Sequence, residues 1–159
     1  MKPNALLHLA WYAKHGEYWS SELNFDWLTA SLHLLREFIK AGGTRFVGGG
    51  TCAEYAWTAA DPCDEHVTPC RPSSVYGACK YALSVAASAL CGKYDVSFAW
   101  GRLYYLYGPG EDSRRLVPSV IRALLASNVA HVTPGDLVRD YMHVDDAASA
   151  LAAVLDDDS

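Results

Sequence analysis

Residues 24–47 read NFDWLTASLHLLREFIKAGGTRFV, and this stretch decides the fold. Its apolar side chains recur every three or four residues, which is the spacing of one helix face; they are Trp27, Leu28, Leu32, Leu35, Phe38 and Ile39. Gly42 and Gly43 follow as a C-terminal stop, because glycine adopts the backbone conformation that ends helices. The stretch predicts an amphipathic helix from about Asn24 to Ala41 and a strand that starts with Arg45–Val47 and ends in Gly48–Thr51.

Segments of the same two kinds lie on both sides of this unit. A short apolar run at Ala5–Ala10 predicts a first strand, buried on both faces. Further along, the sequence predicts helices at Tyr76–Cys91, Leu116–Leu125 and Asp145–Leu155, the last with Asp145 as N-cap, and strands at Val96–Leu103, Val129–Thr133 and Val138–Val144. Helices that separate single strands predict an α/β fold with a mostly parallel sheet and helices on both faces. Such sheets bind ligands where the carboxyl ends of the strands meet.

The composition excludes several classes of protein. Of 159 residues, 51% are hydrophobic and 19% charged, which suits a domain with a packed core and not a disordered chain. A net charge of -5 gives no electrostatic support to a broad nucleic-acid surface. No apolar run approaches the roughly 20 residues that cross a bilayer, and the first residues make a poor signal peptide. We therefore expect a cytoplasmic protein that binds neither membrane nor nucleic acid.

The cysteines predict reduced thiols, because their number, five, is odd and their spacing is irregular. Cys63, His66 and Cys70 lie in one short segment and could form a zinc site with Cys52. They lack the paired Cys-x-x-Cys knuckle of structural zinc sites, so we expect no metal.

The run GGGTCA at Gly48–Ala53 satisfies the G-x-G-x-x-G/A pattern of a dinucleotide phosphate loop. Such a loop must open a helix whose N-terminus faces the phosphates. Here the chain continues into a stretch with Pro62, Pro69 and Pro72, which favours irregular structure. We interpret the glycines as a place where the backbone closely approaches a ligand or another strand.

Tyr76 and Lys80 stand four residues apart, on one face of a predicted helix. A phenol has a pKa of about 10, and a neighbouring ammonium favours the phenolate, so this pair can move a proton near neutral pH. Thr51, at the end of the preceding strand, could orient a substrate oxygen with its hydroxyl. The alternatives are a solvent-exposed lysine, a half-buried tyrosine and a threonine that caps a turn.

Around these residues the chain resembles the extended short-chain dehydrogenase/reductase family, the NAD-dependent epimerases and dehydratases of sugar nucleotides. The resemblance runs from about Leu7 to Leu155. It rests on motifs in the family's order: His8–Trp11, Asn24, Gly50–Thr51 with Glu54–Tyr55, Pro72–Lys80, Gly101–Leu103, Tyr107–Gly110, Leu116–Pro118 and Arg139–Asp146. It implies a Rossmann-like, doubly wound parallel sheet, NAD or NADP as the cofactor, and a nucleotide-diphosphate sugar as the substrate.

The resemblance also implies roles for the residues that match. Tyr76 would be the catalytic acid/base. Lys80 would bind the nicotinamide ribose and lower the pKa of the tyrosine, and Thr51 would hydrogen-bond the sugar oxygen that is oxidised or reduced. Besides Tyr76 and Lys80, the cofactor-binding residues would be Leu9, Ala10, Trp11, Asn24 and Tyr104.

Two further positions bear on the substrate. Arg139 matches an arginine that contacts the substrate diphosphate, a role that suits a forked, charged donor. The alternative is a surface ion pair of Arg139 with Asp136 or Asp140. Tyr105 stands where many relatives have an asparagine that helps to hold the substrate, so the sugar or its binding mode is expected to differ.

The chain departs from the dehydratase pattern at Thr51-Cys52-Ala53, where dehydratases of the family carry Thr-Asp-Glu. The acid and base that eliminate water from the sugar are absent, which disfavours dehydration. Epimerisation, ketone reduction and alcohol oxidation remain, and each proceeds by hydride transfer at a sugar carbon.

The resemblance leads us to expect more chain than is present at both ends. The family's first βαβ units, with their pyrophosphate loop, would precede His8, and part of the substrate-binding segments would follow Ser159. We therefore expect one partial NAD(P)-binding domain over residues 1–159, the catalytic middle of an enzyme, in which residues 107–145 contribute to substrate binding. The alternative is a non-catalytic truncated fragment or association module. An unpaired strand edge and apolar helix faces favour association, so we also expect a homo-oligomer.

Overall fold

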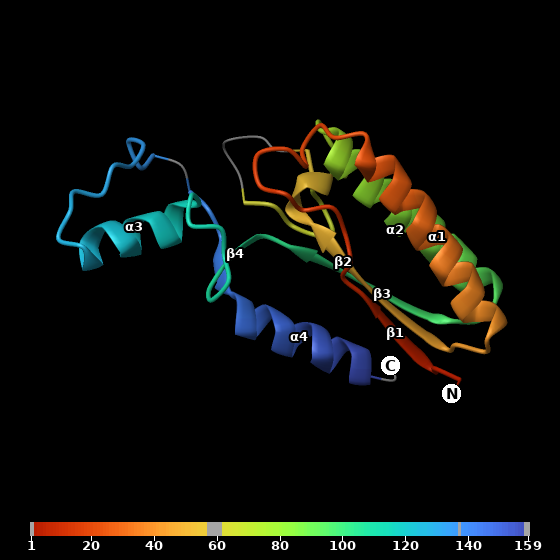
Figure 1. Cartoon of the computed structure of the whole chain (residues 1–159). Coiled ribbons are helices and arrows are strands. Elements are labelled where there is room, and N and C mark those ends of the chain that lie inside the picture. The colour runs from red at the N-terminus through yellow and green to blue at the C-terminus, as the bar shows by residue number, and fades with distance from the viewer. Residues whose placement is uncertain (1, 57–61, 137, 158–159) are drawn as a thin grey trace. The chain divides into compact units, whose positions relative to one another are not determined.

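The computed structural model describes residues 2–56, 62–136 and 138–157 (Figure 1). The chain divides into two compact units. The first comprises Met1–Leu103 and Leu151–Ser159, and the second comprises Tyr104–Ala150. Residues 107–145, which the sequence assigns to substrate binding, fall inside the second unit, and that role stays a prediction.

A three-stranded parallel sheet forms the centre of the first unit. Its strands are β1 (Ala5–His8), β2 (Arg45–Thr51) and β3 (Ser97–Leu103), in the order β1-β2-β3. Leu7 pairs with Val47, and Val47 pairs with Ala99. Because the strands are parallel, their carboxyl ends, and the loops that leave them, meet at one edge of the sheet.

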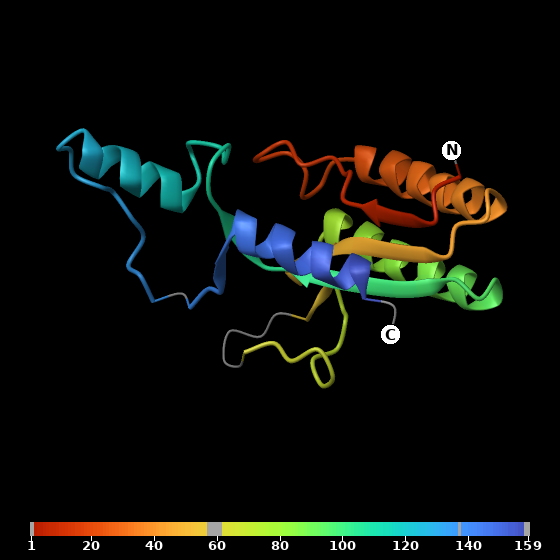
Figure 2. The same cartoon turned by 90° about the horizontal axis from the view of Figure 1, so that it is seen from below.

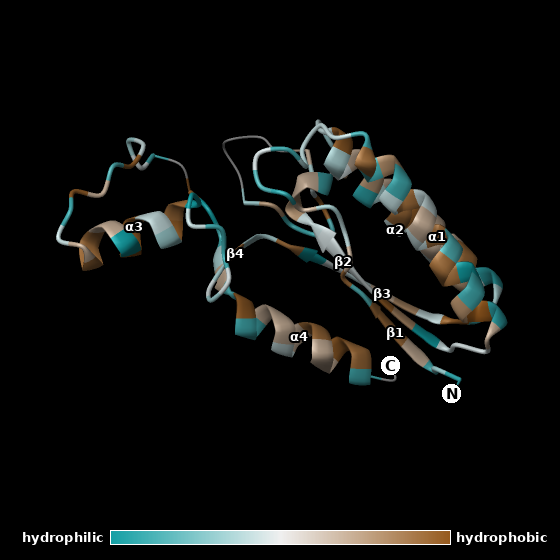
Figure 3. Ribbon diagram, viewed as in Figure 1, coloured by the Kyte–Doolittle hydropathy of each residue, from teal (hydrophilic) through white to brown (hydrophobic). Residues whose placement is uncertain are grey.

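Two long helices, α1 (Leu23–Lys40) and α2 (Val75–Lys93), lie side by side on one face of this sheet (Figures 1 and 2). In α1, polar and apolar residues share the helix surface, as the spacing in the sequence predicts (Figure 3). The core that forms between helices and strands consists of Leu35, Phe38, Phe46, Ala87, Cys91 and Val96. Burial of these side chains is the main stabilising contribution to the unit.

The last turns of α4 (Val144–Asp156) belong to the first unit and contact the sheet. A Cβ added at Gly101 on β3 would lie 3.0 Å from the Leu151 side chain, and Arg45 on β2 donates a hydrogen bond to the Val154 carbonyl. Residues 151–156 thus lie on the face opposite α1 and α2 (Figure 2). The predicted α/β fold, with a parallel sheet between helices, is confirmed.

The predicted ends at glycines agree with the structure in two cases and differ in one. β2 ends in the run Gly48–Thr51, as predicted, whereas Gly92 lies inside α2 rather than after it. Gly42, in contrast, does end α1: its φ is +88°, and its amide bonds the Ile39 carbonyl at 2.9 Å.

The second unit contains two short strands and a helix. β4 (Tyr105–Tyr107) pairs in parallel with β5 (Tyr141–His143), and α3 spans Leu116–Leu125 as predicted. The predicted strand at Val129–Thr133 is wrong: residues 129–133 form no strand, and both valines there are mostly exposed. Asp145 falls in the first turn of α4 and is not its N-cap.

Candidate active site

Thr51 ends β2 at the carboxyl edge of the sheet and begins a single 3-10 turn, η1 (Cys52–Glu54). Its hydroxyl oxygen accepts a hydrogen bond from the Ala53 amide at 3.2 Å, and its own amide donates to Glu54 Oε1 at 2.9 Å. This reciprocal capping box fixes the turn. Thr51 therefore does cap a turn, and its hydroxyl still has a proton to donate elsewhere.

The run GGGTCA does not have the geometry of a phosphate loop, because β2 leads into this one 3-10 turn and not into an α-helix. The glycines instead make room for an indole on the neighbouring strand. A Cβ added at Gly48 would lie 2.2 Å from the Trp100 ring, and one at Gly50 would lie 2.3 Å from its Nε1. Of the two interpretations from sequence, close approach of another strand is the one the structure supports.

Tyr76 stands in the first turn of α2, and both backbone and side-chain contacts hold it there. The Ser74 hydroxyl accepts the Gly77 amide at 3.0 Å and caps the helix, while the Tyr76 amide donates to the Trp19 carbonyl at 3.2 Å. The side chain of Tyr76 forms a hydrogen bond with Thr51. The structure thus brings these two predicted site residues together.

Burial raises the pKa of Tyr76 to about 12, and the hydrogen bond from Thr51 partly opposes this rise. A phenolate can only accept hydrogen bonds, so the threonine hydroxyl is the donor in the bond that favours the charged form. Burial of the phenol is the largest influence on this pKa, and the lowering of the pKa by Lys80 stays a prediction.

Lys80 lies one turn after Tyr76 and is buried, with 3% of its surface exposed, which rules out the solvent-exposed alternative. Its ammonium donates to the Gly49 carbonyl and lies 4.5 Å from the ring centroid of Trp11 and 5.4 Å from that of Trp100. Burial lowers its pKa to about 8, while the charge of Glu54 acts in the opposite direction. Lys80 can therefore lose its proton at a pH that is only slightly above neutral.

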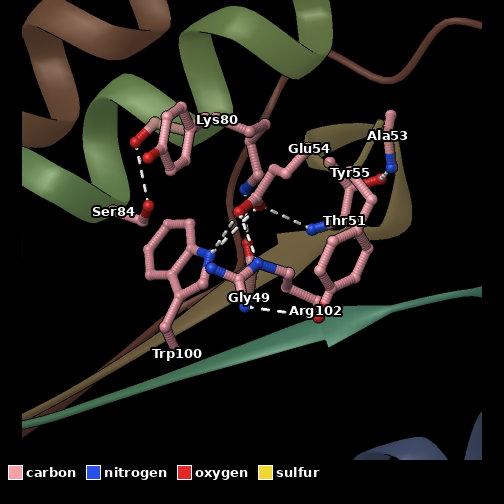
Figure 4. A network of polar contacts seen from close by, with 10 residues as sticks. Gly49, Thr51, Ala53, Glu54, Tyr55, Lys80, Ser84, Trp100 and Arg102 are labelled. Carbon is pink, nitrogen blue, oxygen red and sulfur yellow. Dashed lines mark hydrogen bonds and ion pairs between the residues drawn. The ribbon is translucent and has the colours of Figure 1, made fainter. Parts of the chain in front are cut away.

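Glu54 is the centre of a polar network beneath these residues (Figure 4). Its carboxylate is fully buried and accepts hydrogen bonds from Arg102 Nε at 2.9 Å and from Trp100 Nε1 at 3.1 Å. Arg102 also donates to the Tyr55 hydroxyl at 3.4 Å. Sequence reasoning missed Glu54 as a site residue. The Thr-x-x-Glu spacing of a capping box was the available signal, whereas nothing local links Glu54 to partners more than 40 residues away.

The loop after β1 contains three predicted cofactor residues, and Asn24 anchors it. Leu9 and Ala10 are exposed at the carboxyl edge of the sheet. The Asn24 amide group donates to the carbonyls of Tyr18 and Ser21 at 2.7 and 2.8 Å, and its oxygen accepts the Trp11 indole at 2.8 Å. Asn24 is itself fully buried, so in this structure it orients the loop rather than presenting a surface to a ligand.

Two aromatic residues of this loop, Tyr18 and Trp19, contact the Tyr76 ring. Both meet it edge to face, with centroid distances of 4.9 and 5.7 Å. Sequence reasoning missed them too, although a Tyr-Trp pair in a loop between strand and helix was visible. They cover one side of the phenol and contribute to its burial.

The remaining predicted residues lie in the second unit. Tyr104 separates β3 from β4, and Tyr105 begins β4. The Arg139 guanidinium lies 5.2 Å from the Tyr105 ring centroid, a cation–π distance, and the Tyr105 amide bonds the Asp140 carbonyl at 3.1 Å. The structure thus pairs two of the three residues that the sequence assigns to the substrate.

The described part of the chain offers neither a metal site nor a membrane-spanning helix. Across residues 2–56, 62–136 and 138–157, no group of three or more His, Cys, Asp or Glu side chains could hold a metal ion. All five cysteines lie in the described part of the chain, and none of them forms a disulfide there. Within the same ranges, no helix has both the length and the apolar character needed to cross a membrane.

Comparison with models of known protein families assigns the chain to a family. The model described as the NAD dependent epimerase/dehydratase family matches residues 1–159. The chain belongs to this family. The resemblance inferred from the motifs is therefore confirmed, and the family is described as NAD dependent.

Individual members of the family show how far the likeness extends. The chain is 33% identical over 64 residues to the CDP-abequose synthase of Salmonella typhimurium (strain LT2), which is 40% of this chain and 21% of that protein. The structure of a double mutant of DesIV, a dTDP-glucose 4,6-dehydratase from Streptomyces venezuelae with NAD bound, is 25% identical with a TM-score of 0.78. The match covers 96% of this chain and 48% of DesIV.

The fold is similar to that of an epimerase as well. The UDP-N-acetylglucosamine 4-epimerase from Methanobrevibacter ruminantium M1, in complex with UDP-N-acetylmuramic acid, gives a TM-score of 0.85 at 21% identity, with 98% of this chain and 52% of that one covered. The chain thus spans about half the length of these two family structures. The Rossmann-like fold predicted from the motifs is confirmed.

Proposed function

We propose that these residues serve an NAD-dependent epimerase or oxidoreductase that acts on a nucleotide-diphosphate sugar, by hydride transfer assisted by Tyr76, Lys80 and Thr51. The observation that supports it is the hydrogen bond between Thr51 and Tyr76 at the carboxyl edge of the parallel sheet. Lys80 follows on the same helix, one turn away. Family members with NAD or a nucleotide sugar bound give the two ligand classes.

The residues at this edge fit the nicotinamide end of the cofactor. Leu9 and Ala10 are exposed where ligands bind in such sheets. The Lys80 ammonium has three hydrogens, and the Gly49 carbonyl accepts one of them, which leaves donors for ribose hydroxyls. When bound, the cofactor supplies or accepts the hydride. Titration with NADH and with NADPH distinguishes the two cofactors for this chain.

Tyr76 supplies the proton in this proposal. With its pKa raised to about 12, the phenol carries its proton at neutral pH, and it can donate that proton to a carbonyl oxygen of the sugar as hydride reaches the carbonyl carbon. Thr51, which donates to the same phenol oxygen, can stabilise the phenolate that remains. The protonated phenol supports ketone reduction more directly than alcohol oxidation.

Dehydration is disfavoured because the turn after Thr51 offers no free acid or base. Cys52 and Ala53 have no carboxyl group, and both are buried. Glu54, the one carboxylate in the turn, is fully buried and bonded to Arg102, Trp100 and the Thr51 amide. None of the three side chains can therefore serve as the Asp-Glu pair of a dehydratase.

In the second unit, we propose that Arg139 binds the substrate diphosphate, with its guanidinium supported on the Tyr105 ring. A planar, charged fork matches phosphate oxygens, and the ring contact restricts its orientation. Tyr105 contributes to the choice of sugar, and Tyr104 lines the nicotinamide pocket.

Cofactor binding and turnover test the proposal separately. Fluorescence titration of the chain with NADH and with NADPH measures the affinity for each. In an enzyme that contains this chain, Tyr76→Phe should reduce NADH-dependent reduction of nucleotide-diphosphate keto sugars at least 100-fold, the scale of a lost general acid, with little change in cofactor affinity. Tyr94→Phe, at an exposed position of the same segment, is the control. Ordinary turnover by the Tyr76→Phe variant contradicts the assignment.

A second candidate function, an association module, is favoured by the position of β1. In the described part of the chain, β1 pairs with β2 alone and so forms an edge of the sheet. Unpaired edges favour association with another chain. The mass of the purified chain in solution tests this: an oligomer without affinity for NADH or NADPH supports the module, and a monomer that binds either tightly contradicts it.

A further inference from the structure

Glu54 and Trp100 physically connect Thr51 to Lys80 (Figure 4). On one side, the Glu54 carboxylate accepts the Thr51 amide at 2.9 Å. On the other, the Trp100 indole donates to the same carboxylate at 3.1 Å and places its ring 5.4 Å from the Lys80 ammonium. One carboxylate and one indole therefore lie between two of the candidate catalytic groups.

We propose that Glu54 and Trp100 are positioning residues that hold Thr51 and Lys80 in one fixed arrangement at the carboxyl edge of the sheet. The proposal rests on the proposed function for its catalytic meaning, but the arrangement itself can be tested in this chain alone. Neither residue needs to touch a substrate in this role, since each acts through the residue that it holds.

The burial of the carboxylate makes the arrangement specific. Glu54 is 0% exposed, and a charge without partners at such a site is very unfavourable. Its donors come from three places: the Thr51 backbone, the Trp100 indole and the Arg102 guanidinium. If Thr51 or the indole moved away, a buried oxygen would lose a hydrogen bond, so each donor stabilises the position of the others.

The glycine run of β2 is explained by the same geometry. A Cβ added at Gly50 would lie 2.3 Å from Trp100 Nε1 and 2.7 Å from Glu54 Oε1, between the two bonded atoms. A Cβ at Gly48 would lie 2.2 Å from the far side of the indole. Neither position has room for a side chain, and the indole occupies the space that the glycines leave.

A purely structural ion pair between Glu54 and Arg102 is the competing explanation. The two differ in what the loss of the Glu54 charge does to Lys80. If Glu54 holds and stabilises the ammonium, the titration of Lys80 moves to lower pH when that charge is removed. If the substitution merely loosens the fold, Lys80 gains access to water and its titration moves up, toward the ordinary value of about 10.4.

The pKa values of the groups near Lys80 leave a pH range in which its own titration can be followed. His8 on β1 and Glu54 on η1 act on its charge, and Tyr76 and Cys79 stand on its own helix. Burial and the Lys80 charge lower the pKa of His8, and burial raises those of Cys79 and Tyr76. Lys80 itself titrates at about 8.

The experiment follows Lys80 by NMR in chain carrying lysine labelled with ¹³C at Cε, with the signal assigned through Lys80→Arg. Three variants are compared with the unaltered chain: Glu54→Gln removes the charge, Glu54→Asp retains it, and Trp100→Leu removes the ring. The amide shift of Thr51 is recorded in the same samples, since its hydrogen bond to the carboxylate moves that proton downfield.

We expect Glu54→Gln to shift the Lys80 titration below that of the unaltered chain and to move the Thr51 amide upfield, and Glu54→Asp to restore the titration at least in part. Trp100→Leu should change both signals while Glu54 is intact.

The proposal is overturned if both signals stay unchanged in Glu54→Gln and in Trp100→Leu, or if the Lys80 titration moves to higher pH in Glu54→Gln. Should Glu54→Gln fail to fold, unchanged signals in Trp100→Leu overturn it and changed ones support it. Failure of the chain to bind NADH would instead count against the proposed function.

Discussion

A Cβ added at Gly77 would lie 2.3 Å from the carbonyl oxygen of Ala53. This close approach lets the first turn of α2 contact η1, and it places Tyr76 beside Thr51. We predict that Gly77→Ala destabilises the chain by about 1–3 kcal/mol, the usual cost of overpacking, because the contact is with backbone and cannot be relieved by a rotamer change. Urea unfolding measures the difference.

Gly92→Ala is the matched control for this substitution, since Gly92 lies in the same helix with no atom within 4 Å of a Cβ there. Alanine should stabilise that position by about 0.5–1 kcal/mol through its better helix propensity. Equal effects of the two substitutions would contradict a special approach at Gly77.

Arg102 balances the buried charge of Glu54, at an Nε–Oε2 distance of 2.9 Å. We predict that Arg102→Met destabilises the chain by about 3 kcal/mol, the typical cost of leaving a buried carboxylate without its partner. Chemical unfolding is again the measurement. Arg114→Met, which breaks an exposed pair with Asp112, should change stability little. A similarly small effect of Arg102→Met would show that the Glu54 charge is solvated.

Local patterns predicted the parts of this fold that depend on local interactions. The spacing of apolar residues located α1, and the Tyr76–Lys80 spacing located a helix face whose two residues do lie at the site. The sequence also predicts that β2 ends in the run Gly48–Thr51, as observed. What the glycines accommodate could not be predicted, because Trp100, about 50 residues later, fills the space above them, and such a contact leaves no local trace in the sequence.

The direction of the Tyr76 pKa could not be predicted for a related reason. Helical spacing indicates that an ammonium is one turn away, but it does not show how deeply the phenol is buried. Tyr18 and Trp19, from a loop more than 50 residues earlier, cover the ring, and burial then has the largest influence on the pKa. The identities of candidate residues were thus readable from the sequence, whereas their electrostatic states depend on tertiary packing.

Asn24 fastens the loop after β1 with three hydrogen bonds of 2.7–2.8 Å. Asn24→Ala removes the partner of the Tyr18 carbonyl and of the Trp11 indole, whereas the Ser21 carbonyl keeps the backbone amide of residue 24. We predict that it destabilises the chain by about 2 kcal/mol or more. The freed loop should also be cut faster by trypsin after the exposed Lys14. Asn128→Ala, at an exposed residue, is the control. Unchanged cleavage at Lys14 would show that other contacts hold the loop.

Lys80 should make the stability of the chain depend on alkaline pH. Its pKa of about 8 in the folded state lies below the unfolded value of 10.5, so the folded state binds fewer protons between these two pH values, and stability rises with pH across the window. The full difference corresponds to about 3 kcal/mol. Lys80→Met lacks this gain.

From pH 7.5 to 10.5, the unaltered chain should therefore become more stable relative to Lys80→Met, as urea unfolding at a series of pH values would show. Buried thiols also titrate in this range, but they are common to both chains and cancel in the difference. Lys93→Met, at an exposed lysine of the same helix, is the control: the stability difference between the unaltered chain and this variant should not change with pH in the same way. A constant difference between the unaltered chain and Lys80→Met would mean that the ammonium is hydrated in the folded state.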